Sequence, residues 1–150
     1  CEHNIIILYN KSYNEIYETM KNLNHILTWG HVKTIEGILK KIDCKNVLSD
    51  QFGPDNLIPT ALKNKGIQVN FNQRHNAEAN ISVATASIIA RHHFIVSLNE
   101  ISEKVSQKVP KGASKKVIKM GQQLVQEYGG DILNYVAKVH FKTTTEILYE

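Results

Sequence analysis

The sequence predicts an α/β fold with three parallel strands, flanking helices and a helical C-terminal part. In the first half of the chain, short apolar segments of strand length alternate with segments of helix length. Strands separated by helices favour parallel pairing, because a parallel connection needs a long crossover. The second half shows helical periodicity only. With 150 residues, 42% of them hydrophobic, the chain fits one globular domain with a modest core.

The first half divides into three expected strands and three expected helices. Asn4–Tyr9 is a continuous apolar run, as in a strand covered on both faces. The other two strands are expected over 46–49 and, with alternating apolar and polar residues, over 67–71. The helices are expected over 13–21, behind a Ser12-x-x-Glu15 capping box, over 29–41 and over 59–63.

The second half is expected to hold a long helix and several shorter ones. The long helix, 79–103, is rich in small residues, so it can lie close to a sheet or to a ligand backbone. Its apolar contacts are expected from Val83, Ile88, Ile89 and Phe94. A loop over 110–114 precedes a helix closed by Gly129-Gly130, a short helix capped by Asp131, and a last helix capped by Thr143.

Two acidic residues stand where an α/β fold gathers ligands. Asp50 follows a short apolar strand, and ligands of open α/β sheets bind beyond the carboxyl ends of the strands. Glu78 stands at the start of the long helix, where unpaired N–H groups favour a carboxylate. The alternative is that Glu78 only caps its helix. Asp55, in a Pro-Asp-Asn turn, is a reserve acidic candidate.

Composition and charge limit the classes of function. Eight lysines lie between Lys104 and Lys142 against Glu127 and Asp131, a net charge of +6 that suits a phosphate-backbone partner or, equally, a solvated helix face. No apolar run is expected to span a membrane, and no secretory signal is recognised, so we expect a cytoplasmic location. The two cysteines, Cys1 and Cys44, are expected to be free thiols.

Five ordered motifs resemble ribonuclease HIII, of the type 2 ribonuclease H group, over nearly the whole chain. They are M-K-N-L-N-H-I-L-T-W-G-H (20–31), L-S-D-Q-F (48–52), N-A-E-A-N-I-S-V-A-T-A-S-I-I-A-R (76–91), V-P-K-G-A-S-K-K-V (109–117) and V-A-K-V-H-F-K-T-T (136–144). The resemblance implies a ribonuclease H-like fold, of which residues 1–150 would be the C-terminal portion of a single catalytic domain. It also implies an endonuclease that cuts the RNA strand of RNA/DNA hybrids by two-metal-ion catalysis with Mg²⁺ or Mn²⁺.

The family uses four carboxylates, and the resemblance places the third at Asp50 and the fourth at Glu78. The first two form an adjacent Asp-Glu pair on an early strand, and this chain contains no Asp-Glu dipeptide. We therefore expect the pair and the first strands of the fold to lie in a segment upstream of Cys1. On that expectation the chain alone is inactive, and its partners are the missing N-terminal segment and the RNA/DNA hybrid, with no membrane.

Polar residues in the same motifs are candidates for binding the hybrid, each with a structural alternative. Amide, guanidinium and ammonium groups can donate to phosphate or 2′-hydroxyl oxygens, but they equally cap turns or form ion pairs. His31 and Trp29 are expected to be structural. The substrate-binding candidates are Asn22, Asn24, Gln51, Ser87, Arg91, Lys111, Gly112, Lys115, Lys116, His140, Lys142 and Thr143. A hybrid-binding module that uses the basic 104–142 face without cutting is the competing function.

Overall fold

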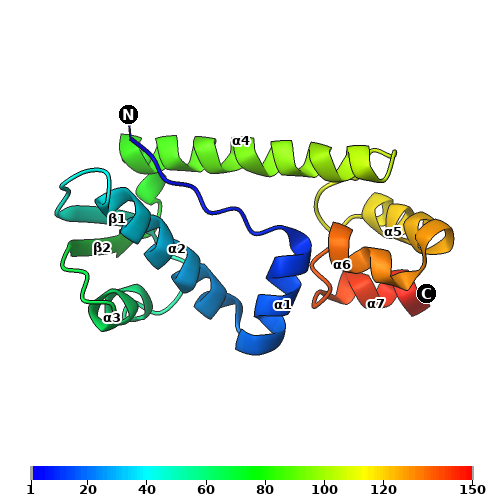
Figure 1. Ribbon diagram of the computed structural model, residues 1–150, viewed down its shortest axis with the longest axis horizontal. Helices are drawn as coiled ribbons and strands as arrows, with labels where there is room; N and C mark the ends of the chain where they lie inside the picture. The colour runs from blue at the N-terminus through cyan, green and yellow to red at the C-terminus, as the bar shows by residue number, and fades with distance from the viewer. Residues whose placement is uncertain (1, 150) are drawn as a thin grey trace. The chain divides into compact units, whose positions relative to one another are not determined.

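The computed structural model describes residues 2–149, which form two compact units (Figure 1). The first unit contains residues 2–7 and 20–91, and the second contains residues 8–19 and 92–149. Along the chain the elements are α1 (Asn10–Met20), α2 (Leu23–Leu39), β1 (Asn46–Asp50), α3 (Leu57–Asn64), β2 (Asn70–Arg74), the 3₁₀ turn η1 (Ala77–Ala79), α4 (Ile81–Lys104), α5 (Lys115–Tyr128), the 3₁₀ turn η2 (Gly130–Ile132), α6 (Leu133–Val136) and α7 (Lys142–Tyr149).

The sheet of the first unit consists of β1 and β2, which pair in parallel from Asn46↔Asn70 to Asp50↔Arg74 (Figure 1). Its core is formed by Val32 and Ile35 of α2 with Ile58 and Leu62 of α3, all buried. Partly buried hydrophobic residues of both strands pack against this cluster, namely Val47 and Phe71. Because side chains alternate along a strand, the two helices cover the sheet face that carries Val47, Ser49, Phe71 and Gln73.

The expected strand over Asn4–Tyr9 is wrong, because that segment is irregular in the structure. A strand needs a neighbour for its N–H and C=O groups, and within residues 2–149 no segment pairs with this one. The side chains of Ile6 and Ile7 remain 41% and 42% exposed. The apolar run therefore identifies a segment of strand composition but not a strand, and the sheet of the described residues has two strands instead of three.

The other expected strands and helices are present with shifted ends. The strand predicted over 67–71 begins three residues later, because Ile67 N–H closes α3 on Leu62 O and both Ile67 and Val69 pack on the core before pairing begins. In α1, Tyr13 N–H already donates to Tyr9 O, so Ser12 lies inside the helix and does not cap it. Thr143 likewise lies inside α7, and Asp131 lies inside η2.

The long helix α4 is present, but the apolar contacts expected from it are only partly found. None of its residues is buried, and Ile88 and Phe94 are 71% and 47% exposed. By length and composition alone α4 could cross a membrane, which corrects the expectation that no apolar run is long enough. One such helix is weak evidence for a membrane span.

In the second unit, α5 packs on α7, and Asn14 of α1 forms hydrogen bonds with backbone groups in and after α6. Leu124, Leu133 and Ile147 are buried, and Gly121 lies against the Ile147 side chain. Buried Asn14 donates from Nδ2 to Asn134 O (3.3 Å) and Ala137 O (2.9 Å), and its Oδ1 accepts from Val139 N (3.1 Å). One amide side chain therefore satisfies three backbone groups. Cys44 is a free thiol as expected, and Cys1 lies outside the described residues.

Asn14→Ala is expected to destabilise the second unit by about 2–3 kcal/mol, because it removes three hydrogen bonds to partly buried backbone groups. The matched control is Asn10→Ala, which removes a single exposed hydrogen bond to Tyr135 O. Urea unfolding followed by far-ultraviolet circular dichroism measures the difference. Equal midpoints for the two variants would contradict the bridging role of Asn14.

Candidate active site

The carboxyl ends of β1 and β2 place Asp50 at the edge of the sheet. Asp50 is the last residue of β1, pairs with Arg74, and has an exposed side chain. The hydrogen bonds between β1 and β2 continue one residue beyond β1, where Gln51 N–H donates to Arg74 O at 3.2 Å. The predicted position of Asp50 at a strand end is confirmed, and parallel pairing puts the end of β2 beside it.

A hydrogen bond brings the segment of Glu78 to Asp50. The Ala77 N–H donates to Asp50 Oδ1 at 3.1 Å, across 27 residues of sequence. Asn76, whose left-handed backbone has φ 56°, turns the chain from β2 into η1 at this point. Glu78 follows Ala77 directly and is exposed. The two carboxylates expected to act together therefore belong to segments in direct contact.

Asp55 lies on the other side of this strand end. Its Oδ1 accepts from Gln51 Nε2 at 2.7 Å and from Gln73 Nε2 at 3.0 Å. By strand alternation Gln51 and Gln73 share a sheet face, and Asp50 is on the opposite face. Gln51, expected to bind substrate, is thus hydrogen-bonded to Asp55.

The donor set at the strand end suits a hard divalent cation but is incomplete. Carboxylate oxygens are the ligands that Mg²⁺ and Mn²⁺ prefer. Within residues 2–149 no group of three or more His, Cys, Asp or Glu side chains is placed to hold a metal ion. Among the described residues, Asp50 and Glu78 therefore do not form a complete cation site by themselves.

Two polar side chains of the 20–31 motif contact neighbouring residues of the first unit. Asn22 caps α2, with its Oδ1 accepting from Asn24 N at 2.9 Å and from His25 N at 3.4 Å. His31 Nδ1 lies 2.8 Å from Leu27 O, and the His31 ring is 4.8 Å from that of Phe52. The Asn24 side chain lies against Gly53, three residues after Asp50.

The remaining candidates lie on α4 and in the second unit. Ser87 and Arg91 are exposed on α4, one helical turn apart. Lys111 and Gly112 belong to the loop before α5, where Gly112 takes φ 91°, and Lys115 and Lys116 begin α5. Lys142 and Thr143 begin α7. All eight lysines of the 104–142 segment are exposed.

His140 packs in an aromatic cluster of the second unit. Its ring stacks on Tyr17 with the centroids 3.8 Å apart, and it lies 4.1 Å from the Phe141 ring. Lys138 Nζ lies 4.4 Å from the centroid of the Tyr13 ring. His140 Nδ1 is buried without a hydrogen-bond partner. Burial and, second, the charge of Lys138 hold the pKa of His140 below its ordinary value of 6.5.

This cluster is expected to make the second unit less stable in acid. A histidine whose pKa is lowered by folding binds fewer protons in the folded state than in the unfolded state, so stability falls as the pH drops below about 6.5. His140→Phe keeps the stacking and removes the titration. Its unfolding free energy between pH 7.5 and pH 5.5 should change less than that of the unsubstituted chain. Parallel pH profiles of the two proteins would contradict this prediction.

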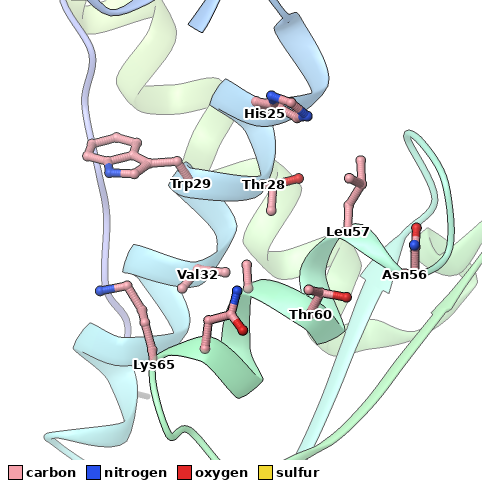
Figure 2. A pocket seen from close by; sticks show the side chains of 10 residues that line it. His25, Thr28, Trp29, Val32, Asn56, Leu57, Thr60 and Lys65 are labelled. Atoms are coloured by element: carbon pink, nitrogen blue, oxygen red, sulfur yellow. The ribbon is translucent and has the colours of Figure 1, made fainter.

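A cavity of about 350 Å³ lies between α2 and α3 (Figure 2), and no acidic residue lines it. His25, Thr28, Trp29 and Val32 of α2 line one side. The other lining residues are Asn56, Leu57, Thr60, Ala61, Asn64 and Lys65.

Gln73, Arg74 and the Ala77 N–H are the parts of the site that the sequence reading missed. All three follow the strand predicted over 67–71, which the structure moves to 70–74. The sequence did carry one signal for Gln73 and Arg74, because they are two polar residues that directly follow an apolar segment of strand length. A backbone N–H carries no signal in the sequence.

Comparison with known proteins identifies the fold and the family. The sequence model of the ribonuclease HII family matches residues 1–144. Ribonuclease HIII of Protochlamydia amoebophila is 41% identical over 148 residues, which cover 99% of this chain and 49% of that protein. Ribonuclease HIII of Chlamydia felis is 37% identical, covering 98% and 50%. The chain thus spans about half the length of the curated relatives it matches.

Two solved structures resemble the chain. Bst-RNase HIII in complex with Mn²⁺ superposes with a TM-score of 0.89 at 24% identity, covering 97% of this chain and 49% of the other. Aquifex aeolicus RNase H3 superposes with a TM-score of 0.68 at 27% identity, covering 89% and 46%. The expected ribonuclease H-like fold is confirmed, and the chain belongs to the ribonuclease HII family.

Proposed function

We propose that this chain forms the C-terminal part of a ribonuclease H catalytic domain that hydrolyses the RNA strand of RNA/DNA hybrids. The observation that carries the proposal is the hydrogen bond from Ala77 N–H to Asp50 Oδ1, which joins the segment of Glu78 to the end of β1. Two exposed carboxylates from distant parts of the sequence therefore belong to segments that are in contact. The resemblance of the sequence motifs to ribonuclease HIII, which places two of the family's carboxylates at Asp50 and Glu78, supports this proposal.

Asp50 and Glu78 are proposed to hold Mg²⁺ or Mn²⁺. Divalent ions bound there would supply positive charge for the developing negative charge of phosphoryl transfer. The complex of Bst-RNase HIII with Mn²⁺ supports a divalent metal in a related protein. The carboxylates of this chain would orient the ions from one side, with Asp50 itself held by Ala77 N–H.

The other ligands are proposed to come from a second polypeptide segment. The chain contains no Asp-Glu dipeptide, and residues 2–149 offer no cluster of three possible ligands. The curated relatives are about twice as long as this chain, so their remaining half is the proposed source. By itself the chain should bind a cation weakly and leave a hybrid uncut.

A chimera tests this proposal. The chain replaces the matching half of the Protochlamydia amoebophila relative, and a hybrid with a labelled RNA strand is incubated with the chimera and Mg²⁺. Cleavage of the RNA strand, with the matching all-DNA duplex left intact, is the expected result. A correctly folded chimera that binds the hybrid and leaves it whole would reject hydrolysis in favour of the second candidate.

The second candidate is a hybrid-binding module, which the eight exposed lysines of the 104–142 segment favour. Backbone binding by lysines releases counterions, so the logarithm of affinity should fall linearly with the logarithm of salt concentration. Removing Lys115 and Lys116 together should reduce that slope by about 2, since each phosphate contact contributes about 1. Lys63→Ala on α3, outside this segment, is the control and should leave the slope unchanged. An unchanged slope in the double variant would contradict backbone binding at the start of α5.

A further inference from the structure

Asp55 joins the ends of the two strands through a single carboxylate oxygen. Its Oδ1 accepts from Gln51 Nε2 and from Gln73 Nε2, at 2.7 and 3.0 Å. A residue of the turn before α3 thus connects the side chain after β1 with a side chain of β2.

The two glutamines belong to the last rungs of the sheet, next to Asp50. Gln73 pairs with Ser49, and Gln51 extends the ladder through its N–H bond to Arg74 O. Both side chains are on the face covered by α2 and α3, whereas strand alternation turns Asp50 to the opposite face. Asp55 therefore approaches the sheet from the side away from Asp50 and is not placed to share a cation with it.

We propose that Asp55 is a positioning residue that aligns the ends of β1 and β2 and so holds Asp50 against the Ala77 N–H. A two-stranded sheet is only marginally stable, and its last rung is the part most prone to opening. Because Asp55 binds both glutamine side chains, it limits the opening of this last rung. The functional consequence rests on the proposed role of Asp50 as a cation ligand, but the alignment itself does not.

The role of Asp55 requires an acceptor oxygen and not a negative charge. Asp55→Asn keeps a carbonyl oxygen that can accept both bonds, whereas Asp55→Ala removes it. A metal ligand would behave differently, because the amide of asparagine is a poor substitute for a carboxylate on Mg²⁺ or Mn²⁺. Asp43→Ala is the matched control, since Asp43 is exposed in the turn before the other end of β1.

Hydrogen exchange of the Ala77 N–H in the 150-residue chain is the main test, because that group reports on Asp50 and is touched by neither substitution. We expect exchange about fivefold faster in Asp55→Ala, on the scale of one lost hydrogen bond, and within about twofold of the unsubstituted chain in Asp55→Asn and Asp43→Ala. Unchanged exchange of the α2 amides, which belong to the same unit, shows that the first unit is folded. An unchanged rate in Asp55→Ala, or an equal rise in Asp55→Asn, would overturn the proposal.

A titration with Mn²⁺, followed by broadening of the Asp50 amide signal, separates this inference from the proposed function. Asp55→Ala should weaken Mn²⁺ binding about threefold to tenfold and Asp55→Asn should restore it. If Asp55→Asn weakens binding as much as Asp50→Asn does, Asp55 is itself a ligand and the proposal fails. If the unsubstituted chain binds no Mn²⁺ at Asp50, the proposed function fails, while the Ala77 exchange rates still decide the role of Asp55.

Discussion

Asp50→Asn in the chimera is expected to lower the rate of hybrid hydrolysis by about a thousandfold or more, which corresponds to about 4 kcal/mol of lost transition-state stabilisation. The substitution is nearly isosteric, and the amide oxygen of asparagine can still accept the Ala77 N–H. The turn that carries Glu78 therefore keeps its place while the negative charge is removed. Glu78→Gln should cause a loss of similar size, because both charges are proposed to hold the same ions.

Cleavage of a labelled hybrid under single-turnover conditions measures this loss separately from product release. Asp43→Asn, the same change of charge at an exposed turn of the same unit, is the control and should retain the full rate. Hybrid affinity should change little in either site variant, since the lysines are expected to supply binding. Full activity in both Asp50→Asn and Glu78→Gln would show that the site lies elsewhere.

Ile58→Ala is expected to destabilise the first unit by about 3–4 kcal/mol. Ile58 is 1% exposed and joins α3 to Val32 and Ile35 of α2 against the sheet. Truncation removes the transfer free energy of the side chain and leaves a cavity that the surrounding helices and sheet fill only in part. The same core packs against β1, which ends in Asp50. The lower stability should therefore also reduce, on warming, the fraction of molecules in which Asp50 is correctly placed.

Urea unfolding followed by fluorescence of Trp29, the single tryptophan of the chain, reports on the first unit, because Trp29 is part of α2. The control is Ile88→Ala on α4, where the side chain is 71% exposed and the change should stay within about 0.5 kcal/mol. A midpoint for Ile58→Ala equal to that of Ile88→Ala would contradict the assignment of the core.

The sequence predicted correctly that Asp50 lies at the end of a strand and that Glu78 precedes the long helix. The apolar segment before Asp50 is β1, and the segment of Glu78 does precede the long helix. Their proximity could be anticipated because the ends of parallel strands share one edge of the sheet. The bond through which Ala77 N–H links them could not, since backbone groups leave no mark in the sequence.

The composition of a segment does not predict whether it pairs with another strand. Asn4–Tyr9 has the composition of a buried strand, but pairing is a property of two segments, and no described residue supplies the second. The strand expected over 67–71 was displaced by three residues, because Ile67 and Val69 serve the core before the ladder begins. Because of this shift, Gln73 was not expected in the strand, and its hydrogen bond to Asp55 could not be predicted.

We propose that Asp50 and Glu78 hold one divalent cation together. Paramagnetic broadening of amide signals in the 150-residue chain, titrated with Mn²⁺, tests it directly. If the two carboxylates bind one ion, the signals of Asp50 and Glu78 broaden together at the same Mn²⁺ concentration, and Asp50→Asn shifts both responses to higher concentration. Broadening of one signal without the other, or an undisturbed Glu78 response in Asp50→Asn, would contradict it.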